Sequence, residues 1–208
     1  MSKPDLVYLD HNATTPVAPE ILAKLPSFAQ AWGNPSSIHA GGRDPKQILR
    51  ETRRDLAAHL NCSPLELVFT SGGSESNNTV LKAVWNKIGS KRNHFISSAV
   101  EHPTLMKTME WLEEQGARVD YIPVDRRGRL DVEKYRALLC EETALVSVMA
   151  ANNETGTLFP IRELADLAHG AGALFHTDAV QMLGKMPLDL KALNVDYASF
   201  SAHKVYAL

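Results

Sequence analysis

The sequence predicts an α/β protein with three layers, in which a mainly parallel sheet lies between two layers of helices. Helical and strand patterns alternate from about residue 43 onward, which is typical of βαβ units and a parallel sheet. Segment 144–149 is apolar apart from Ser147, as expected of a strand covered on both faces. A chain of 208 residues is long enough for one such domain with a small extension.

The first 42 residues differ from the rest and are expected to form an N-terminal arm. Five prolines interrupt them, and only one short helix is predicted, near residues 19–31. We expect this arm to wrap on the main domain, which would comprise residues 43–208.

Each element of the main domain follows from its local pattern. Segment 46–60 has apolar residues at helical spacing, and the short run 67–70 before a glycine pair predicts a buried strand. Ser74 is a candidate N-cap for the next helix, and Pro103 suits the first turn of another. The remaining predicted elements are strands 94–98, 117–122, 144–149, 173–177 and 195–200, and helices 103–115, 131–139 and 161–170.

Composition excludes several classes of partner. The chain is 44% hydrophobic and 22% charged with a net charge of −2, which favours neither nucleic acid nor a membrane surface. No apolar run approaches the roughly 20 residues needed to cross a bilayer, and the N-terminus lacks a signal pattern. A cytoplasmic location is expected.

The cysteines and histidines predict no metal site and no disulfide framework. Cys62 and Cys140 are far apart and form no Cys-x-x-Cys motif, and no two histidines are four residues apart. Free cysteines often behave as small apolar residues, so we expect both to be structural.

Polar clusters follow five of the predicted strands. Ligands of such sheets bind outside the carboxyl ends of the strands, so these clusters should converge on one cleft. They are Gly72-Gly73-Ser74, Glu101-His102, Asn152-Asn153-Glu154, Asp178 with Gln181, and Ser201-Ala202-His203-Lys204.

These residue types suit a phosphorylated pyridine such as pyridoxal 5'-phosphate (PLP). The glycine pair at a helix start could bind phosphate, although an ordinary strand-to-helix turn explains it equally. Asp178 could hold a proton on a ring nitrogen or merely cap a helix. His102 could stack on the ring or be a satisfied buried histidine. Lys204 could form a Schiff base with the aldehyde, although most lysines are solvated surface charges.

The chain resembles the cysteine desulfurases, PLP enzymes of the class V aminotransferase superfamily with the fold type I architecture. The likeness extends from Tyr8-Leu9-Asp10-His11-Asn12-Ala13-Thr14-Thr15-Pro16 to Lys204. It includes 33–39, 69–78, 152–156 and 176–181.

The resemblance implies a role for each residue of the site. Lys204 would bind the cofactor covalently, and His102 would stack on its ring. Asp178 would pair with the ring nitrogen, while Asn153 and Gln181 would bond near the ring hydroxyl. The phosphate would contact Gly73, Ser74, Ser201 and His203.

The resemblance also implies a reaction and partners. The substrate would be L-cysteine, which the family converts to L-alanine while its sulfur passes to an enzyme persulfide. The sulfur would then pass to acceptor proteins of iron–sulfur assembly or tRNA thiolation. Family members are homodimers.

The chain departs from the family pattern in two places. Ala202 replaces a glycine, and its methyl group is expected to crowd the cofactor slightly. The chain ends four residues after Lys204, so we expect a truncated form that lacks the nucleophilic cysteine, the substrate-binding arginine and the small C-terminal domain.

Three other interpretations stay open. One is another class V PLP enzyme, such as a selenocysteine lyase. The second is a non-catalytic fragment that at most binds PLP or a partner subunit. A dinucleotide-binding protein is disfavoured because Gly72-Gly73-Ser74-Glu75 does not match Gly-x-Gly-x-x-Gly.

Overall fold

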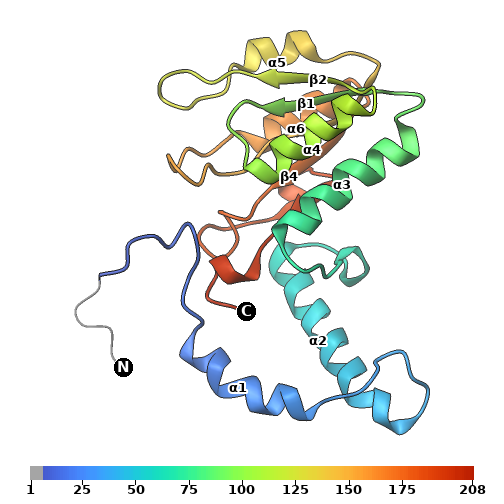
Figure 1. Cartoon of the computed structure of the whole chain (residues 1–208), viewed down its shortest axis with the longest axis vertical. Coiled ribbons are helices and arrows are strands. Elements are labelled where there is room, and N and C mark those ends of the chain that lie inside the picture. The colour runs from blue at the N-terminus through green and yellow to red at the C-terminus, as the bar shows by residue number, and fades with distance from the viewer. Residues whose placement is uncertain (1–6) are drawn as a thin grey trace.

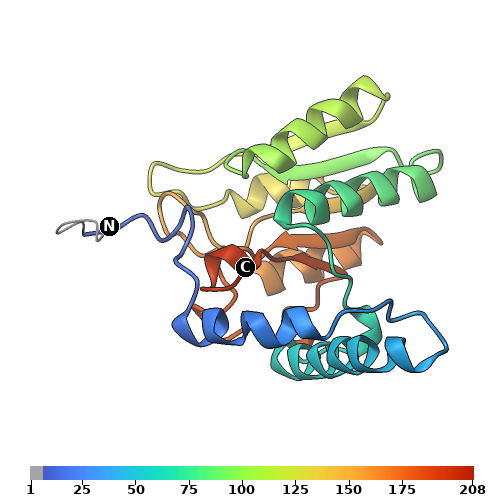
Figure 2. The same cartoon turned by 60° about the horizontal axis from the view of Figure 1, so that its bottom comes forward.

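A computed structural model describes residues 7–208 and contains one parallel five-stranded sheet (Figures 1 and 2). The order of the strands across the sheet is β2-β1-β3-β4-β5, and every neighbouring pair is parallel. The strands are β1 (His94–Ser98), β2 (Arg118–Ile122), β3 (Thr143–Ser147), β4 (Leu174–Asp178) and β5 (Tyr197–Ser199). The predicted α/β class and all five of these strands are confirmed.

Helices cover both faces of this sheet, as the three-layer prediction requires. The helices are α1 (Pro19–Gln30), α2 (Arg43–Leu60), α3 (Gly73–Ile88), α4 (Pro103–Glu114), α5 (Val132–Leu138), α6 (Ile161–Gly170) and α7 (Leu190–Leu193). Three short 3₁₀ helices are η1 (Ala40–Gly42), η2 (Pro64–Glu66) and η3 (Ala202–Lys204). None of the helices in the described part of the chain is long and apolar enough to span a bilayer.

Successive residues of the central strands enter two different cores. Phe95 and Leu145 pack with apolar residues of α3 and α4, whereas Ile96 and Val146 pack with α5 and α6. Because side chains alternate between the faces of a strand, a run that is apolar throughout serves both cores. This two-sided burial holds the carboxyl ends of the strands in register.

The predicted strand at 67–70 is wrong, because this segment lies outside the sheet. Val68 is 78% exposed and Phe69 is 47% exposed, and the Arg53 guanidinium stacks over the Phe69 ring at 4.8 Å. The apolar run resembles that of a buried strand, but no described strand pairs with it. The local sequence pattern does not indicate whether another strand lies beside this segment to form hydrogen bonds with it.

The start of α3 also differs from the prediction. The helix begins at Gly73 with Gly72 at the N-cap position, so Ser74 does not cap it. The other predicted helices are confirmed to within a few residues.

The N-terminal arm reaches the main domain only in part. The N–H of Thr15 donates to His203 O (2.9 Å), and the N–H of Ala18 donates to Tyr206 O (2.9 Å). By contrast, none of the residues of α1 is buried. These two bonds attach the stretch before α1 to the segment around Lys204, and the expected wrapping of the arm stays a prediction. The boundary at residue 42 stays a prediction.

Tyr135→Phe is expected to lower the free energy of unfolding by about 1 kcal/mol. The Tyr135 hydroxyl is fully buried and donates to Leu164 O at 2.9 Å, which joins α5 to α6. Urea unfolding measures the loss, and Tyr121→Phe, at a partly exposed residue, is the matched control with no expected change. Equal effects of the two substitutions would contradict this role.

Candidate functional site

All nine sequence-predicted site residues line one cavity of about 380 Å³ at the carboxyl edge of the sheet. Its volume is within the range of small-molecule pockets. The structure thus brings these nine together, whereas Glu101, Asn152, Glu154 and Ala202 of the predicted clusters do not line the cavity. The roles of the residues in cofactor binding stay predictions. The nine are Gly73, Ser74, His102, Asn153, Asp178, Gln181, Ser201, His203 and Lys204.

A larger depression of about 710 Å³ lies elsewhere, beside α6. Its charged side chains are exposed and already paired, as Arg136 is with Glu163 (3.1 Å) and Arg162 with Asp166 (2.7 Å). Size alone would favour this depression. The chemistry favours the smaller cavity, because a lysine, a buried carboxylate and an imidazole meet only there among the residues lining the two.

The start of α3 forms an open cradle on the cavity wall. A Cβ atom at position 73 would come within 3.1 Å of Val180 Cγ2, so only glycine leaves this space free. The first-turn N–H groups of a 16-residue helix carry a partial positive charge suited to phosphate. Glu75 lies at the same rim, where its carboxylate accepts from the Ser71 N–H, and this bond lowers the pKa of Glu75.

Asp178 ends β4 with its carboxylate buried and held at both oxygens. Oδ1 accepts from the N–H of Val180 (3.0 Å), and Oδ2 accepts from Asn77 Nδ2 (2.8 Å). The first bond closes a local turn, and no described helix begins there, so the alternative of a helix cap is wrong. The second comes from a residue that the sequence analysis did not single out.

Asn77 joins Asp178 to His102 through a chain of hydrogen bonds. Its amide also donates to Thr104 Oγ1 (3.2 Å), which leaves the Thr104 hydroxyl free to donate to His102 Nδ1 (2.8 Å). His102 Nδ1 further accepts from the Thr104 N–H (3.3 Å), so the imidazole caps α4. The two residues expected to flank a cofactor ring are therefore oriented by one shared network. Asn77 lies on the buried face of α3 with Leu81 and Val84. A polar residue at this apolar helical spacing is the signal in the sequence that could have identified it.

Asn77→Ala is expected to destabilise the chain by about 2 kcal/mol, because a buried carboxylate oxygen loses a hydrogen-bond donor. Chemical unfolding of the purified chain measures this loss. The neighbouring Asn78→Ala is a matched control, since Asn78 only donates to Ser74 O within α3. A change for Asn77→Ala as small as the control would show that Asp178 does not depend on this donor.

The amide of Gln181 is occupied by the N-terminal arm. Nε2 donates to Asn12 O (2.8 Å), and Oε1 accepts from Lys185 Nζ (2.7 Å). Asn12 Nδ2 also donates to Asn153 O (3.1 Å). The arm thus closes one side of the cavity, and a ligand hydroxyl at Gln181 would compete with Asn12.

Lys204 lies on η3 and lines the cavity beside Ser201 and His203. His203 Nδ1 is 3.0 Å from Thr14 Oγ1, so the arm also braces this segment. Burial and the nearby charge of Lys204 lower the pKa of Lys185. Ala202 is exposed and does not line the cavity, so the expected crowding by its methyl group is wrong.

Glu101 is a buried acid directly behind the site. Its Oε1 accepts from the N–H of Met149 (2.9 Å) and from the Ser98 hydroxyl, while Oε2 has no hydrogen-bond partner. Burial, with a smaller contribution from Asp178, raises the pKa of Glu101 to about 8. A neutral Glu101 avoids placing two buried carboxylates together.

The residues present fit PLP. The cavity combines a glycine cradle at a helix start, a held carboxylate, an imidazole and a primary amine. In PLP, these four groups would meet the phosphate, the pyridine nitrogen, the flat ring and the aldehyde, in that order.

Comparisons with known proteins agree with this geometry. A cysteine desulfurase of Gluconacetobacter diazotrophicus is 50% identical over 205 residues, which cover 97% of this chain and 51% of that protein. The solved structure of a NifS-like protein superposes with a TM-score of 0.93 at 40% identity, covering 96% of this chain and 56% of that one. SspA, solved in complex with cysteine, has a TM-score of 0.92 at 33% identity over 97% and 58% of the two chains.

The chain spans about half the length of the curated relatives it matches. The family model described as aminotransferase class-V matches residues 7–208. This match covers every described residue, including all nine that line the cavity. The chain therefore belongs to the class-V aminotransferase family.

Proposed function

We propose that this chain provides the cofactor-binding part of a PLP-dependent cysteine desulfurase, which converts L-cysteine to L-alanine and passes the sulfur to a thiol as a persulfide. The observation that carries the proposal is the meeting of Lys204, Asp178 and His102 in one cavity with a glycine cradle. The similarity to cysteine desulfurases over 97% of the chain supports the same reaction.

Each residue would act on a different part of the cofactor. Lys204 would attach the aldehyde, and the glycine cradle with Ser74, Ser201 and His203 would bind the phosphate. When bound, PLP supplies an electron-withdrawing ring that stabilises negative charge on the substrate. Asp178 would hold a proton on the ring nitrogen, and its bond to Asn77 would keep the carboxylate aimed at that atom.

His102 would cover one face of the ring with its imidazole. Nδ1 accepts from Thr104, so the neutral ring carries its proton on Nε2. That N–H could donate a hydrogen bond or its proton to the substrate. Asn153 and Gln181 would bond near the ring hydroxyl, with Gln181 exchanging its bond to Asn12.

The sulfur-accepting thiol is a separate requirement. Neither Cys62 nor Cys140 lines the cavity, so we propose that neither accepts sulfur from the substrate. The expected partners, sulfur-acceptor proteins of iron–sulfur assembly or tRNA thiolation and a second subunit of the same kind, are part of this proposal. So is a cytoplasmic location.

The test is to incubate the purified chain with PLP, L-cysteine and dithiothreitol, an external dithiol that accepts the sulfur and reduces it to sulfide, and to measure L-alanine and sulfide. Release of both supports desulfuration, and preference for L-selenocysteine would favour a selenocysteine lyase instead. Binding of PLP without L-alanine would favour the non-catalytic alternative. Failure to bind PLP at all would contradict the proposed site.

A further inference from the structure

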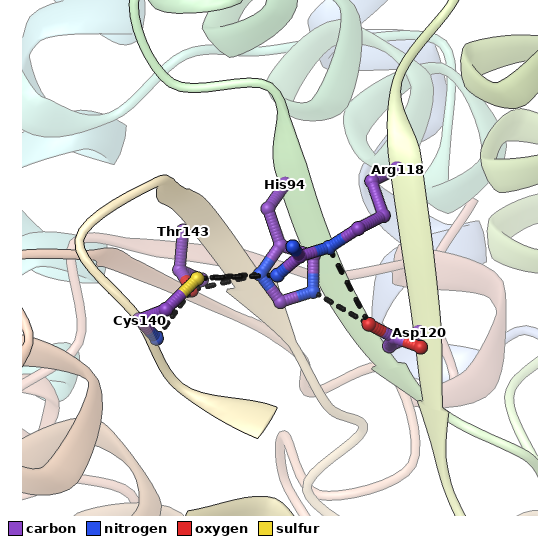
Figure 3. Close-up of polar contacts among 5 residues, drawn as sticks. All are labelled: His94, Arg118, Asp120, Cys140 and Thr143. Carbon is purple, nitrogen blue, oxygen red and sulfur yellow. Dashed lines mark hydrogen bonds and ion pairs between the residues drawn. The ribbon is translucent and has the colours of Figure 1, made fainter. Parts of the chain in front are cut away.

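A second cluster of reactive side chains, drawn in Figure 3, lies toward the amino-terminal ends of the strands, whereas the cavity lies at their carboxyl ends. Its members come from the amino-terminal ends of β1, β2 and β3 and from the turn before β3. Strand β1 alone separates the two edges by about 13 Å, at roughly 3.3 Å per residue. The cluster consists of His94, Arg118, Asp120, Cys140 and Thr143.

His94 is oriented as a base toward Cys140. Its ring is fully buried, and Nε2 is 3.1 Å from Asp120 Oδ2. Because a carboxylate only accepts, the proton of the neutral ring belongs on Nε2, which leaves Nδ1 as an acceptor shared by the Thr143 hydroxyl and the Cys140 thiol. Nδ1 is 3.5 Å from Cys140 Sγ and shares this direction with the Thr143 hydroxyl at 2.9 Å. Burial, followed by the Arg118 charge, lowers the pKa of His94, so the imidazole is neutral near pH 7.

The positively charged guanidinium of Arg118 lies beside the sulfur of Cys140. Its Nη2 donates to Cys140 Sγ at 3.1 Å, and its Nε is 3.6 Å from Asp120 Oδ2. The Arg118 side chain is half exposed, and Cys140 is partly exposed beside it. A nearby cation stabilises a thiolate, which is the reactive form of cysteine.

Glu142 acts against this charge. It is exposed, and its pKa is lowered chiefly by a hydrogen bond with the Cys140 side chain and further by the Arg118 charge. The groups that face Cys140 are therefore one cation, one neutral base with its carboxylate, and one exposed carboxylate. Among these groups, Arg118 makes the shortest printed contact with the sulfur, at 3.1 Å, compared with 3.5 Å for His94 Nδ1.

We propose that Cys140 is a nucleophilic modification site that forms mixed disulfides with low-molecular-weight disulfides. The Cys140 thiol transfers its proton to His94 Nδ1, and the sulfur attacks one sulfur of the small disulfide. The reagent's S–S bond breaks as the mixed disulfide forms, and the departing thiolate takes the proton from His94. This site is independent of the proposed desulfurase chemistry and replaces the expectation that Cys140 is merely structural.

Cys62 provides an internal comparison. It is also free and partly exposed, but burial and the nearby Glu66 carboxylate raise its pKa. No imidazole or guanidinium contact to Cys62 is present among the described hydrogen bonds. The two thiols thus share exposure class and differ in their electrostatic surroundings.

Competition between the two cysteines tests the proposal. The purified chain is treated with limiting iodoacetamide, and separately with oxidised glutathione, and each cysteine peptide is quantified over time by mass spectrometry. Near pH 7, Cys140 is expected to react about tenfold faster than Cys62. In urea the two rates should become equal, because the difference depends on the fold.

Two variants that remove charges of opposite sign test whether charge or solvent exposure sets the reaction rate of Cys140. Arg118→Gln is expected to slow Cys140 about tenfold, since a hydrogen bond to a charged sulfur is lost, and Glu142→Gln should accelerate it about threefold. Cys62 should be unaffected in both. Arg129→Gln, which removes another exposed arginine that pairs with an aspartate, Asp125, should change neither rate.

The proposal is overturned if Cys62 reacts as fast as Cys140 in the folded chain. It is also overturned if Glu142→Gln leaves the Cys140 rate unchanged, and this surface variant remains informative even if Arg118→Gln fails to fold. Circular dichroism of each variant establishes folding. The cofactor is absent from this assay, so its outcome does not depend on the proposed function.

Discussion

Lys204→Ala is expected to abolish borohydride-stable attachment of PLP to the chain. Lys204 is the lysine whose side chain lines the cavity together with Asp178 and His102. Only an amine held beside the bound aldehyde reacts efficiently, because positioning supplies most of the rate advantage. Peptide mass spectrometry after reduction should find the label at position 204 in the unmodified chain and nowhere in the variant.

Lys185→Ala is the matched control for that experiment. Lys185 is close enough to Lys204 for its pKa to be lowered by it, yet its ammonium donates to Asn12 and Gln181. This variant should keep full labelling at position 204. Label spread over many surface lysines, or equal loss in both variants, would mean that the cavity does not hold PLP as proposed.

Raising the pH from about 6.5 to about 8 is expected to destabilise the native chain through Glu101. Burial raises the pKa of Glu101 to about 8 from an ordinary 4.5. The native chain therefore keeps a proton that the unfolded chain releases. This stability is fully present below about pH 4.5 and is lost as the pH rises toward 8. The slope can reach about 1.4 kcal/mol per pH unit.

The pH window is chosen to isolate this group from buried His176. Burial lowers the pKa of His176 to about 3 from 6.5, so His176 costs stability only as the pH falls below about 6.5. Urea unfolding between pH 6.5 and 8 should give a falling free energy for the unmodified chain.

Glu101→Gln should remove most of that slope, because an amide keeps the shape of the acid and does not titrate. Glu154→Gln, a substitution at an exposed acid, should retain it. A Glu101→Gln profile parallel to that of the unmodified chain would show that Glu101 is ionised in the native state.

Local sequence patterns were sufficient for much of the fold. Strands 94–98 and 117–122 and helix 161–170 were predicted nearly to the residue, because their periodicity, prolines and glycines act within a few positions. The parallel order then places strand ends at one edge, which is why the site residues after β1, β3, β4 and β5 could be named from their positions. Gly73 and Ser74 follow no strand, and only the glycine pair before a helix pointed to them.

The tertiary structure decided what depends on distant neighbours. Segment 67–70 has a strand-like sequence but no partner, and Ser74 suits an N-cap that Gly72 occupies. Asn77 and Glu101 gain their importance from the buried groups beside them rather than from their own motifs.

The amino-acid sequence by itself determined the α/β layering and the set of residues at the carboxyl edge, since both follow from short-range periodicity and strand direction. Only the tertiary structure decided the Asp178–Asn77–Thr104–His102 network, the contact of Asn12 with Gln181, and the cluster around Cys140. These features join side chains from separate elements. Their hydrogen bonds and charges depend on ångström-scale distances, which residue type and spacing do not specify.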